Sequence, residues 1–215
     1  TWELPEWNEF IKRECHWFEL EQNSENQVRV WDSFLAHQLI RICACSGLRP
    51  KEWSLLKWKD VNLFDIENAV DEYEKLGAEI TTDPSTKTGQ RQAYCTGGIY
   101  FQNIFQKTKF KGKNDWIFSD LEGNRLDPDW FSEIFNGEGK CNGLMDFTEQ
   151  YKLTGKHLVP YCLRHFYASQ SIYNGVPEHI IADNMGITKA RLNKSYKHCF
   201  LRLQTKALFL CLIHI

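Results

Sequence analysis

The sequence predicts an α+β fold that is mostly α-helical, with a small antiparallel three-stranded sheet near its middle. Helix-start and helix-stop residues punctuate the chain before residue 61, and the helical pattern returns after Gly98. Between them, short β-prone runs alternate with turn residues. The chain has 215 residues, 42% hydrophobic and 25% charged, which suits a globular protein with a substantial core.

Helix-terminating residues divide the first 60 residues. Pro5 suits the first turn of a helix. Ser24 with Gln27 reads as a capping box that opens a second helix, and Gly47 is a typical helix end. Pro50 starts a third, short helix. We therefore expect a helix from residue 5 to about 22, a second that opens at Ser24 and runs to about Ser46, and a short helix from residue 50.

The middle of the chain changes to a strand pattern. The turn-rich run DPSTKTGQ separates two β-prone runs and predicts a hairpin. The expected strands cover residues 61–66, 78–82 and 91–96, and the expected later helices cover 99–107, 128–136, 159–173, 177–185 and 189–196.

The net charge of −2 gives no overall basic footprint of a nucleic-acid binder, yet the charges are unevenly placed. Acidic residues gather in 65–83, whereas residues 106–113 read QKTKFKGK, so a local basic face is compatible with the total. The longest strongly apolar run, residues 207–213, is too short to span a bilayer, and no signal peptide opens the chain. Without Met at position 1, the chain reads as a fragment of a longer cytoplasmic protein.

The eight cysteines show no metal-ligand spacing: there is no C-x-x-C pair, and the close pair Cys43 and Cys45 lies in an apolar helical stretch. We expect reduced, mostly buried thiols at the eight positions, and no metal site. They are Cys15, Cys43, Cys45, Cys95, Cys141, Cys162, Cys199 and Cys211.

Four segments carry residues suited to chemistry on a phosphate: SGLRPKEWSLLKWKDV at 46–61, TKTGQRQAY at 86–94, PYCLRHFYAS at 160–169 and NMGITKARLNKSYKH at 184–198. In this order they resemble the motifs of the phage-integrase family of tyrosine recombinases, over roughly residues 25–200. The matching residues are Ser46, Gly47, Leu48, Arg49, Glu52, Trp58 and Asp60; Lys87, Thr88 and Gly89; Leu163, Arg164 and His165; and Met185, Gly186, Tyr196 and His198.

The resemblance implies the catalytic core of a DNA breaking–rejoining enzyme. Arg49 and Arg164 would hold the non-bridging phosphate oxygens, because a guanidinium stays charged and binds two oxygens at once. Lys87 would protonate the leaving 5′-oxygen. Tyr196 would be the nucleophile and form a 3′-phosphotyrosyl bond without a cofactor or metal. Glu52, three residues after Arg49, would orient that arginine or the neighbouring histidine position through a charged hydrogen bond.

Two positions depart from the family pattern. Tyr161 stands where the family usually has a histidine; its hydroxyl can still donate to a phosphate, and its spacing from Arg164 suits one helix face. Ile187 stands where the family has histidine or tryptophan, and isoleucine donates no hydrogen bond. Thr188 or Lys189 could take that role. His165 occupies a family position that mainly supports the site.

The resemblance also implies double-stranded DNA as the partner and a homo-tetramer on DNA, with a monomer possible without it. The lysines at 107, 109, 111 and 113 are either phosphate contacts or a solvated loop. We treat residues 1–215 as one catalytic domain, with a leading helix over about 1–24. The apolar tail at about 199–215 docks on a neighbouring protomer or packs on its own domain. A second DNA-clamping domain is expected outside this chain.

Three other readings stay open. The same fold could serve chromosome-dimer resolution or telomere processing instead of integration and excision of a phage or mobile element. Ile187 suggests a catalytically impaired DNA-binding relative. The third reading is a helical interaction module with chance motif matches.

Overall fold

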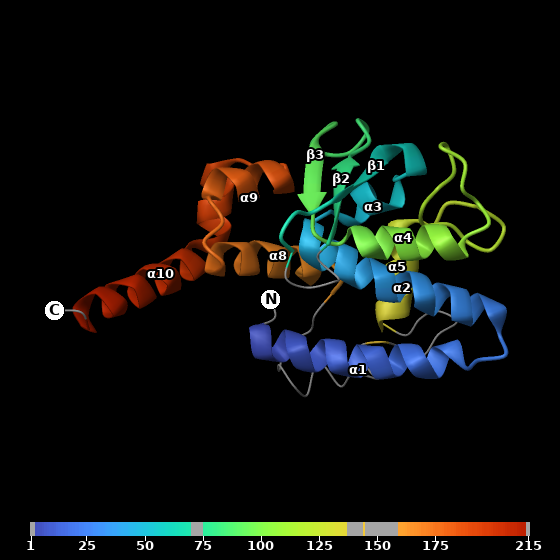
Figure 1. The fold of residues 1–215 in the computed structure, drawn as a ribbon, viewed down its shortest axis with the longest axis horizontal. Helices are drawn as coiled ribbons and strands as arrows, with labels where there is room; N and C mark the ends of the chain where they lie inside the picture. Colours follow the sequence, from blue (N-terminus) through green and yellow to red (C-terminus); the bar gives the residue numbers. More distant parts are fainter. Residues whose placement is uncertain (1–2, 70–74, 137–143, 145–158, 214–215) are drawn as a thin grey trace.

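In the computed structural model, residues 3–69, 75–136, 144 and 159–213 are described, with side chains up to residue 202 in the last helix. The chain is mostly helical with one small sheet, as predicted (Figure 1). Its elements are α1 (Leu4–Gln22), α2 (Gln27–Ser46), α3 (Pro50–Ser54), the 3-10 turn η1 (Trp58–Asp60), β1 (Val61–Asp65), β2 (Leu76–Thr81), β3 (Gln92–Cys95), α4 (Gly98–Lys107), α5 (Pro128–Asn136), α8 (Tyr161–Tyr173), α9 (Glu178–Met185) and α10 (Lys189–Ile213).

The three strands form an antiparallel sheet in the order β1-β2-β3, which confirms the predicted sheet. Val61 pairs with Ile80, and Ala78 pairs with Cys95. Beyond the last pair, the Thr82 amide donates to the Arg91 carbonyl at 2.9 Å, so the hairpin ladder continues into the β2–β3 loop. This loop carries the K-T-G triplet and holds it at one end of the sheet.

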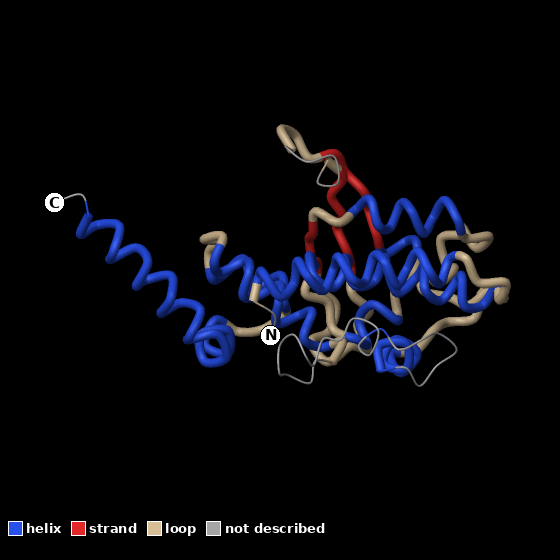
Figure 2. The backbone as a smooth tube through the Cα atoms, turned by 90° about the horizontal axis from the view of Figure 1, so that it is seen from below, coloured by secondary structure: helices blue, strands red, loops and turns tan. Residues whose placement is uncertain are grey.

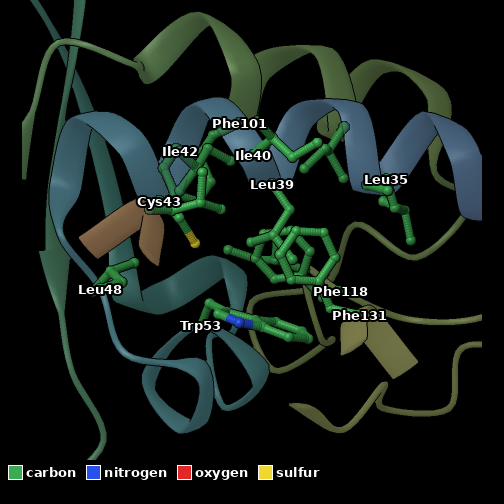
Figure 3. Close-up of a cluster of buried hydrophobic side chains, with 14 of the residues drawn as sticks. Leu35, Leu39, Ile40, Ile42, Cys43, Leu48, Trp53, Phe101, Phe118 and Phe131 are labelled. Carbon is green, nitrogen blue, oxygen red and sulfur yellow. The ribbon is translucent and has the colours of Figure 1, made fainter. Parts of the chain in front are cut away.

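Helix α2 is the centre of the larger core. It packs against α1, α4 and α8, and Figure 1 shows it lying between α1 and α4. Its buried side chains meet the Trp53 ring, which makes edge contacts with Phe118 and Phe131 at centroid distances of 5.2 and 6.2 Å (Figure 3). Aromatic burial of this size anchors α3, and therefore the segment just after Arg49, to the core.

A second, smaller core joins α8, α9 and α10. It includes Ile172, Ile181, Met185, Leu192 and Tyr196. The motif at residues 184–198 is thus packed on the motif at residues 160–169 through a cluster separate from the main core.

The ends of α2 differ in how well the sequence predicts them. The Gly47 cap is confirmed: it has a left-handed φ of 66°, and a Cβ there would lie 2.5 Å from the Tyr167 ring. The capping box from Ser24 is wrong. Asn26 caps the helix instead, because its Oδ1 accepts from the amides of Val28 and Arg29.

The last helix is longer than predicted. Expected to end near residue 196, α10 continues to Ile213, and Tyr196 sits at a kink with φ −120° and ψ 21°. Residues 197–213 contain no glycine or proline that would end the helix. In both views α10 projects beyond the rest of the molecule (Figures 1 and 2).

Six of the eight cysteines fall among the described side chains and carry free thiols. Cys141 and the side chain of Cys211 lie outside the described residues. None of the helices in the described part of the chain is long and apolar enough to cross a membrane.

Candidate active site

Arg49 and Glu52 meet at the start of α3. Arg49 is the residue before the helix, and its backbone amide donates to Glu52 Oε2 at 2.8 Å. The Arg49 guanidinium donates to Glu52 Oε1 at 2.7 Å and to the Gly186 carbonyl at 3.1 Å. The predicted bond between Glu52 and Arg49 is therefore present, and it fixes the guanidinium beside the last motif.

The β2–β3 loop brings Lys87 and Thr88 to the same place. Thr88 Oγ1 accepts from Arg49 at 3.0 Å and lies 3.3 Å from Glu52 Oε1, to which it donates. Gly89 has a φ of +68°, a conformation that glycine adopts without strain. The turn thus places the exposed Lys87 next to Arg49, as the resemblance implies.

These segments enclose a pocket of about 450 Å³. Among the described residues that line it are three cations, Arg49, Lys87 and Arg191, and no carboxylate. Glu52 lies behind Arg49 with its side chain fully buried. The described residues of the lining are Arg49, Lys87, Thr88, Tyr161, Gly186, Ile187, Thr188 and Arg191. A cavity of this charge suits a phosphate group.

Helix α8 places Tyr161 and Arg164 differently. Tyr161 is 42% exposed and lines the pocket. Arg164 is 2% exposed and donates to the carbonyls of Gly47 and Met185, the latter at 2.5 Å. Burial, with Arg49 close by, lowers the pKa of Arg164. Arg164 thus links the motif at residues 46–61 to the motif at residues 184–198 and is not part of the pocket lining.

Tyr196 is 4% exposed and is not among the residues that line the pocket. Its Oη lies 2.7 Å from Nδ1 of His165, and burial raises the pKa of Tyr196 to about 12. Burial is the largest cause that lowers the pKa of His165, and the positive charges of the N-terminus and then of Arg164 lower it further, so its imidazole is neutral near pH 7. With its proton on Nε2, that imidazole accepts the phenol hydrogen at Nδ1.

Two side chains that the sequence did not single out, the half-buried Arg91 and the buried Asn184, hold the site together. Arg91 donates to Glu52 Oε2 at 2.8 Å and to the Asn184 carbonyl. The Asn184 amide donates to the Ser46 and Tyr94 carbonyls, each at 3.1 Å. Arg91 lies two residues after the K-T-G turn, which is a signal in the sequence. Asn184 gives none, because its partners are distant in sequence.

Ile187 lines the pocket, so the wall contains an apolar side chain where the resemblance has a donor. Thr188, which also lines the pocket, caps the start of α10: its Oγ1 accepts from the Arg191 amide at 3.2 Å. Lys189 is exposed and is not part of the lining.

The lysines after α4 do not join this pocket. Figure 1 shows their loop at the end of the molecule opposite α9 and α10. Lys107 Nζ lies 4.3 Å above the Phe34 ring, and Lys111 Nζ lies 5.3 Å above the Phe105 ring. Lys109 and Lys113 are exposed.

Known proteins share this sequence pattern and fold. A model of the phage integrase family matches residues 19–201. A probable integrase/recombinase protein of Methanocaldococcus jannaschii is 24% identical over 179 residues, 81% of this chain and 48% of that protein. This chain thus spans about half the length of that curated relative.

Solved structures give the same fold. XerA recombinase superposes with a TM-score of 0.59 at 15% identity, over 90% of this chain and 57% of that one. XerH site-specific recombinase bound to palindromic difH substrate gives a TM-score of 0.61 at 16% identity, over 93% of this chain and 51% of that one. At these identities the likeness is one of fold.

Proposed function

The chain belongs to the phage integrase family, and we propose that it is the catalytic domain of a tyrosine-type site-specific DNA recombinase. The observation that carries the proposal is the convergence of three motifs on one pocket. Arg49, Lys87 and Tyr161 come from separate segments and line the same cavity, whose described lining is cationic. Double-stranded DNA in the cytoplasm of a bacterium or phage host is the proposed substrate.

The proposed cleavage step transfers a phosphoryl group from the 5′-oxygen of DNA to Tyr196 Oη. Tyr196 Oη attacks the phosphorus, the bond to the 5′-oxygen breaks, and a 3′-phosphotyrosyl ester forms. Arg49 stabilises the charge on the non-bridging oxygens, and Arg164 joins it once the phosphate replaces the Gly47 and Met185 carbonyls at its guanidinium. Lys87 gives a proton to the leaving 5′-oxygen. Attack by a 5′-hydroxyl of a partner strand reverses these steps and rejoins the DNA.

The phenol proton has a nearby acceptor in His165. Its Nδ1 lies 2.7 Å from Tyr196 Oη, whereas Tyr161 is a weak base at neutral pH. Tyr196 must turn toward the pocket to reach a phosphate there, and the kink at its own backbone is the place for that rotation. We propose that the buried Tyr196 is the resting position and that DNA binding draws it out.

The proposed assembly is a tetramer on DNA, in which residues 1–215 form one catalytic domain and the tail beyond residue 199 docks on a neighbouring copy. The relatives are longer, which supports a second DNA-clamping domain in the whole protein. Integration and excision of a phage or mobile element is the proposed role. Chromosome-dimer resolution uses the same chemistry, and the flanking genes and attachment sites separate the two.

Trapping the covalent intermediate tests the proposal. A nicked suicide duplex carrying the core site releases a short strand on cleavage, so the enzyme stays attached to DNA. We expect the full-length protein to form this adduct and Tyr196→Phe to form none. Absence of adduct with the full-length protein on its own site would overturn the proposal.

Two observations favour a second candidate, a catalytically impaired DNA-binding relative. Ile187 puts an apolar side chain in the pocket wall, and Tyr196 lies outside the lining. That candidate predicts specific DNA binding without any adduct, so the same experiment decides between the two.

A further inference from the structure

Arg191 is a cation of the pocket that belongs to none of the motif positions. It is the third residue of α10, is exposed, and lines the pocket together with Arg49 and Lys87. The Thr188 cap fixes the first turn of α10 and therefore the base of this side chain. No other described residue forms an ion pair with the Arg191 guanidinium, so its charge is available to a ligand.

Among its described residues, the pocket wall that carries Arg191 has no other strong hydrogen-bond donor. Ile187 in this wall has no polar side-chain atom, and Thr188 offers a neutral hydroxyl. A guanidinium is charged and can bind two phosphate oxygens, and such charge-assisted bonds are roughly twice as strong as neutral ones. Of the groups on this wall, Arg191 is the one suited to an anionic oxygen.

We propose that Arg191 is a catalytic residue that contacts the scissile phosphate and supplies the hydrogen bond that Ile187 cannot make. The inference rests on the proposed recombinase function. Arg191 and Tyr196 lie five residues apart on α10, and Arg191 already lines the pocket into which Tyr196 must turn.

The test is the rate of adduct formation in a single turnover on the suicide duplex. We expect Arg191→Ala to lower this rate on the order of 10²-fold, the loss seen when one oxyanion donor is removed. Arg191→Lys should recover part of the rate. The matched control is Lys194→Ala, which removes the same charge from an exposed position of α10 outside the pocket lining.

Two further measurements separate phosphate contact from helix stability or general DNA affinity. Ile187→His in the Arg191→Ala background should restore cleavage, because it returns a donor to the same wall. A duplex with a neutral methylphosphonate at the scissile position should reduce the difference between wild type and Arg191→Ala to about twofold, since there is less charge to stabilise. Equal thermal melting of all variants shows that the fold is intact.

The outcomes distinguish the two proposals. A wild-type protein that forms no adduct overturns the proposed function and this inference with it. Normal cleavage by Arg191→Ala, or an equal loss in Lys194→Ala, overturns the inference alone.

Discussion

Glu52 holds its charge in the interior, where two guanidiniums and a hydroxyl satisfy its oxygens. Arg49 and Thr88 contact Oε1, whereas Arg91 and the Arg49 amide contact Oε2. A buried carboxylate is tolerated only with such partners, and removing one member leaves the others as uncompensated buried charges. Glu52 thus holds Arg49, Thr88 and Arg91 in place behind the cationic pocket.

We predict that Glu52→Gln destabilises the protein by roughly 3–5 kcal/mol, the usual cost of breaking a buried ion pair. Urea unfolding followed by tryptophan fluorescence measures it. Glu122→Gln, at an exposed loop position, is the control and should change the free energy of unfolding by less than about 0.5 kcal/mol. A Glu52→Gln protein as stable as the control would show that the network contributes nothing.

The pH dependence of cleavage should report His165. Its pKa is lowered from 6.5 by burial, so the neutral form that accepts a proton is fully present above that pH. The cleavage rate should therefore fall only as the pH drops below 6.5, through the lowered pKa. His165→Asn should remove this acid limb and slow cleavage about 10²–10⁴-fold. A limb unchanged in His165→Asn would exclude this histidine as the proton acceptor.

At the scale of elements, α9 forms hydrogen bonds that hold α2, β3 and α8 together. The Asn184 side chain accepts from the Tyr94 amide in β3. It donates to the Tyr94 carbonyl, to the Ser46 carbonyl at the end of α2 and to the Tyr167 hydroxyl of α8. Gly186, two residues after Asn184, ends α9 with a φ of +59°. A Cβ at this position would lie 2.6 Å from Arg91 Nε, so the Arg91 side chain packs against the Gly186 backbone. These contacts hold the last motif against the sheet.

We predict that Asn184→Leu opens the junction between α9 and β3. Each buried backbone group left unsatisfied costs about 1–3 kcal/mol, so hydrogen exchange at the Tyr94 amide should accelerate well beyond that of the remaining strand pairs. Asp183→Asn, an exposed change on the same helix, should leave it unaltered. Equal protection of the Tyr94 amide in both variants would show that the Asn184 side chain does not hold α9 against β3.

Local signals predicted most elements, whereas the site depends on contacts that are distant in sequence. Proline, glycine and the K-T-G turn each act within a few residues, so the helices, the sheet and the hairpin followed from them. Asn184 reaches Ser46 across 138 positions, and no local pattern encodes such a bond. Motif resemblance located Arg49, Lys87 and Tyr161, but not the burial of Arg164 and Tyr196, which depends on how α8, α9 and α10 pack.

At the scale of the whole molecule, charge is segregated. The chain carries a net charge of −2, yet the described lining of the pocket is cationic and a second set of lysines follows α4. Local positive surfaces of this kind attract DNA even when the total charge is slightly negative. Affinity should therefore depend strongly on salt although the protein is acidic overall.

The salt dependence tests the lysine loop. If Lys109 and Lys113 contact phosphates, changing both to alanine should reduce the slope of log affinity against log salt concentration by about 0.9 per contact, without changing site preference. Fluorescence anisotropy on the core duplex between low and moderate salt measures this. An unchanged slope would identify the loop as a solvated surface.

The covalent intermediate gives the most direct test of the central claim. After cleavage of the suicide duplex, nuclease digestion leaves a nucleotide on the attacking residue, and peptide mass spectrometry identifies that residue. We predict the nucleotide on Tyr196, through a 3′-phosphate ester, with none on the pocket-lining Tyr161. A nucleotide on Tyr161, or on any other side chain, would contradict this account of the site.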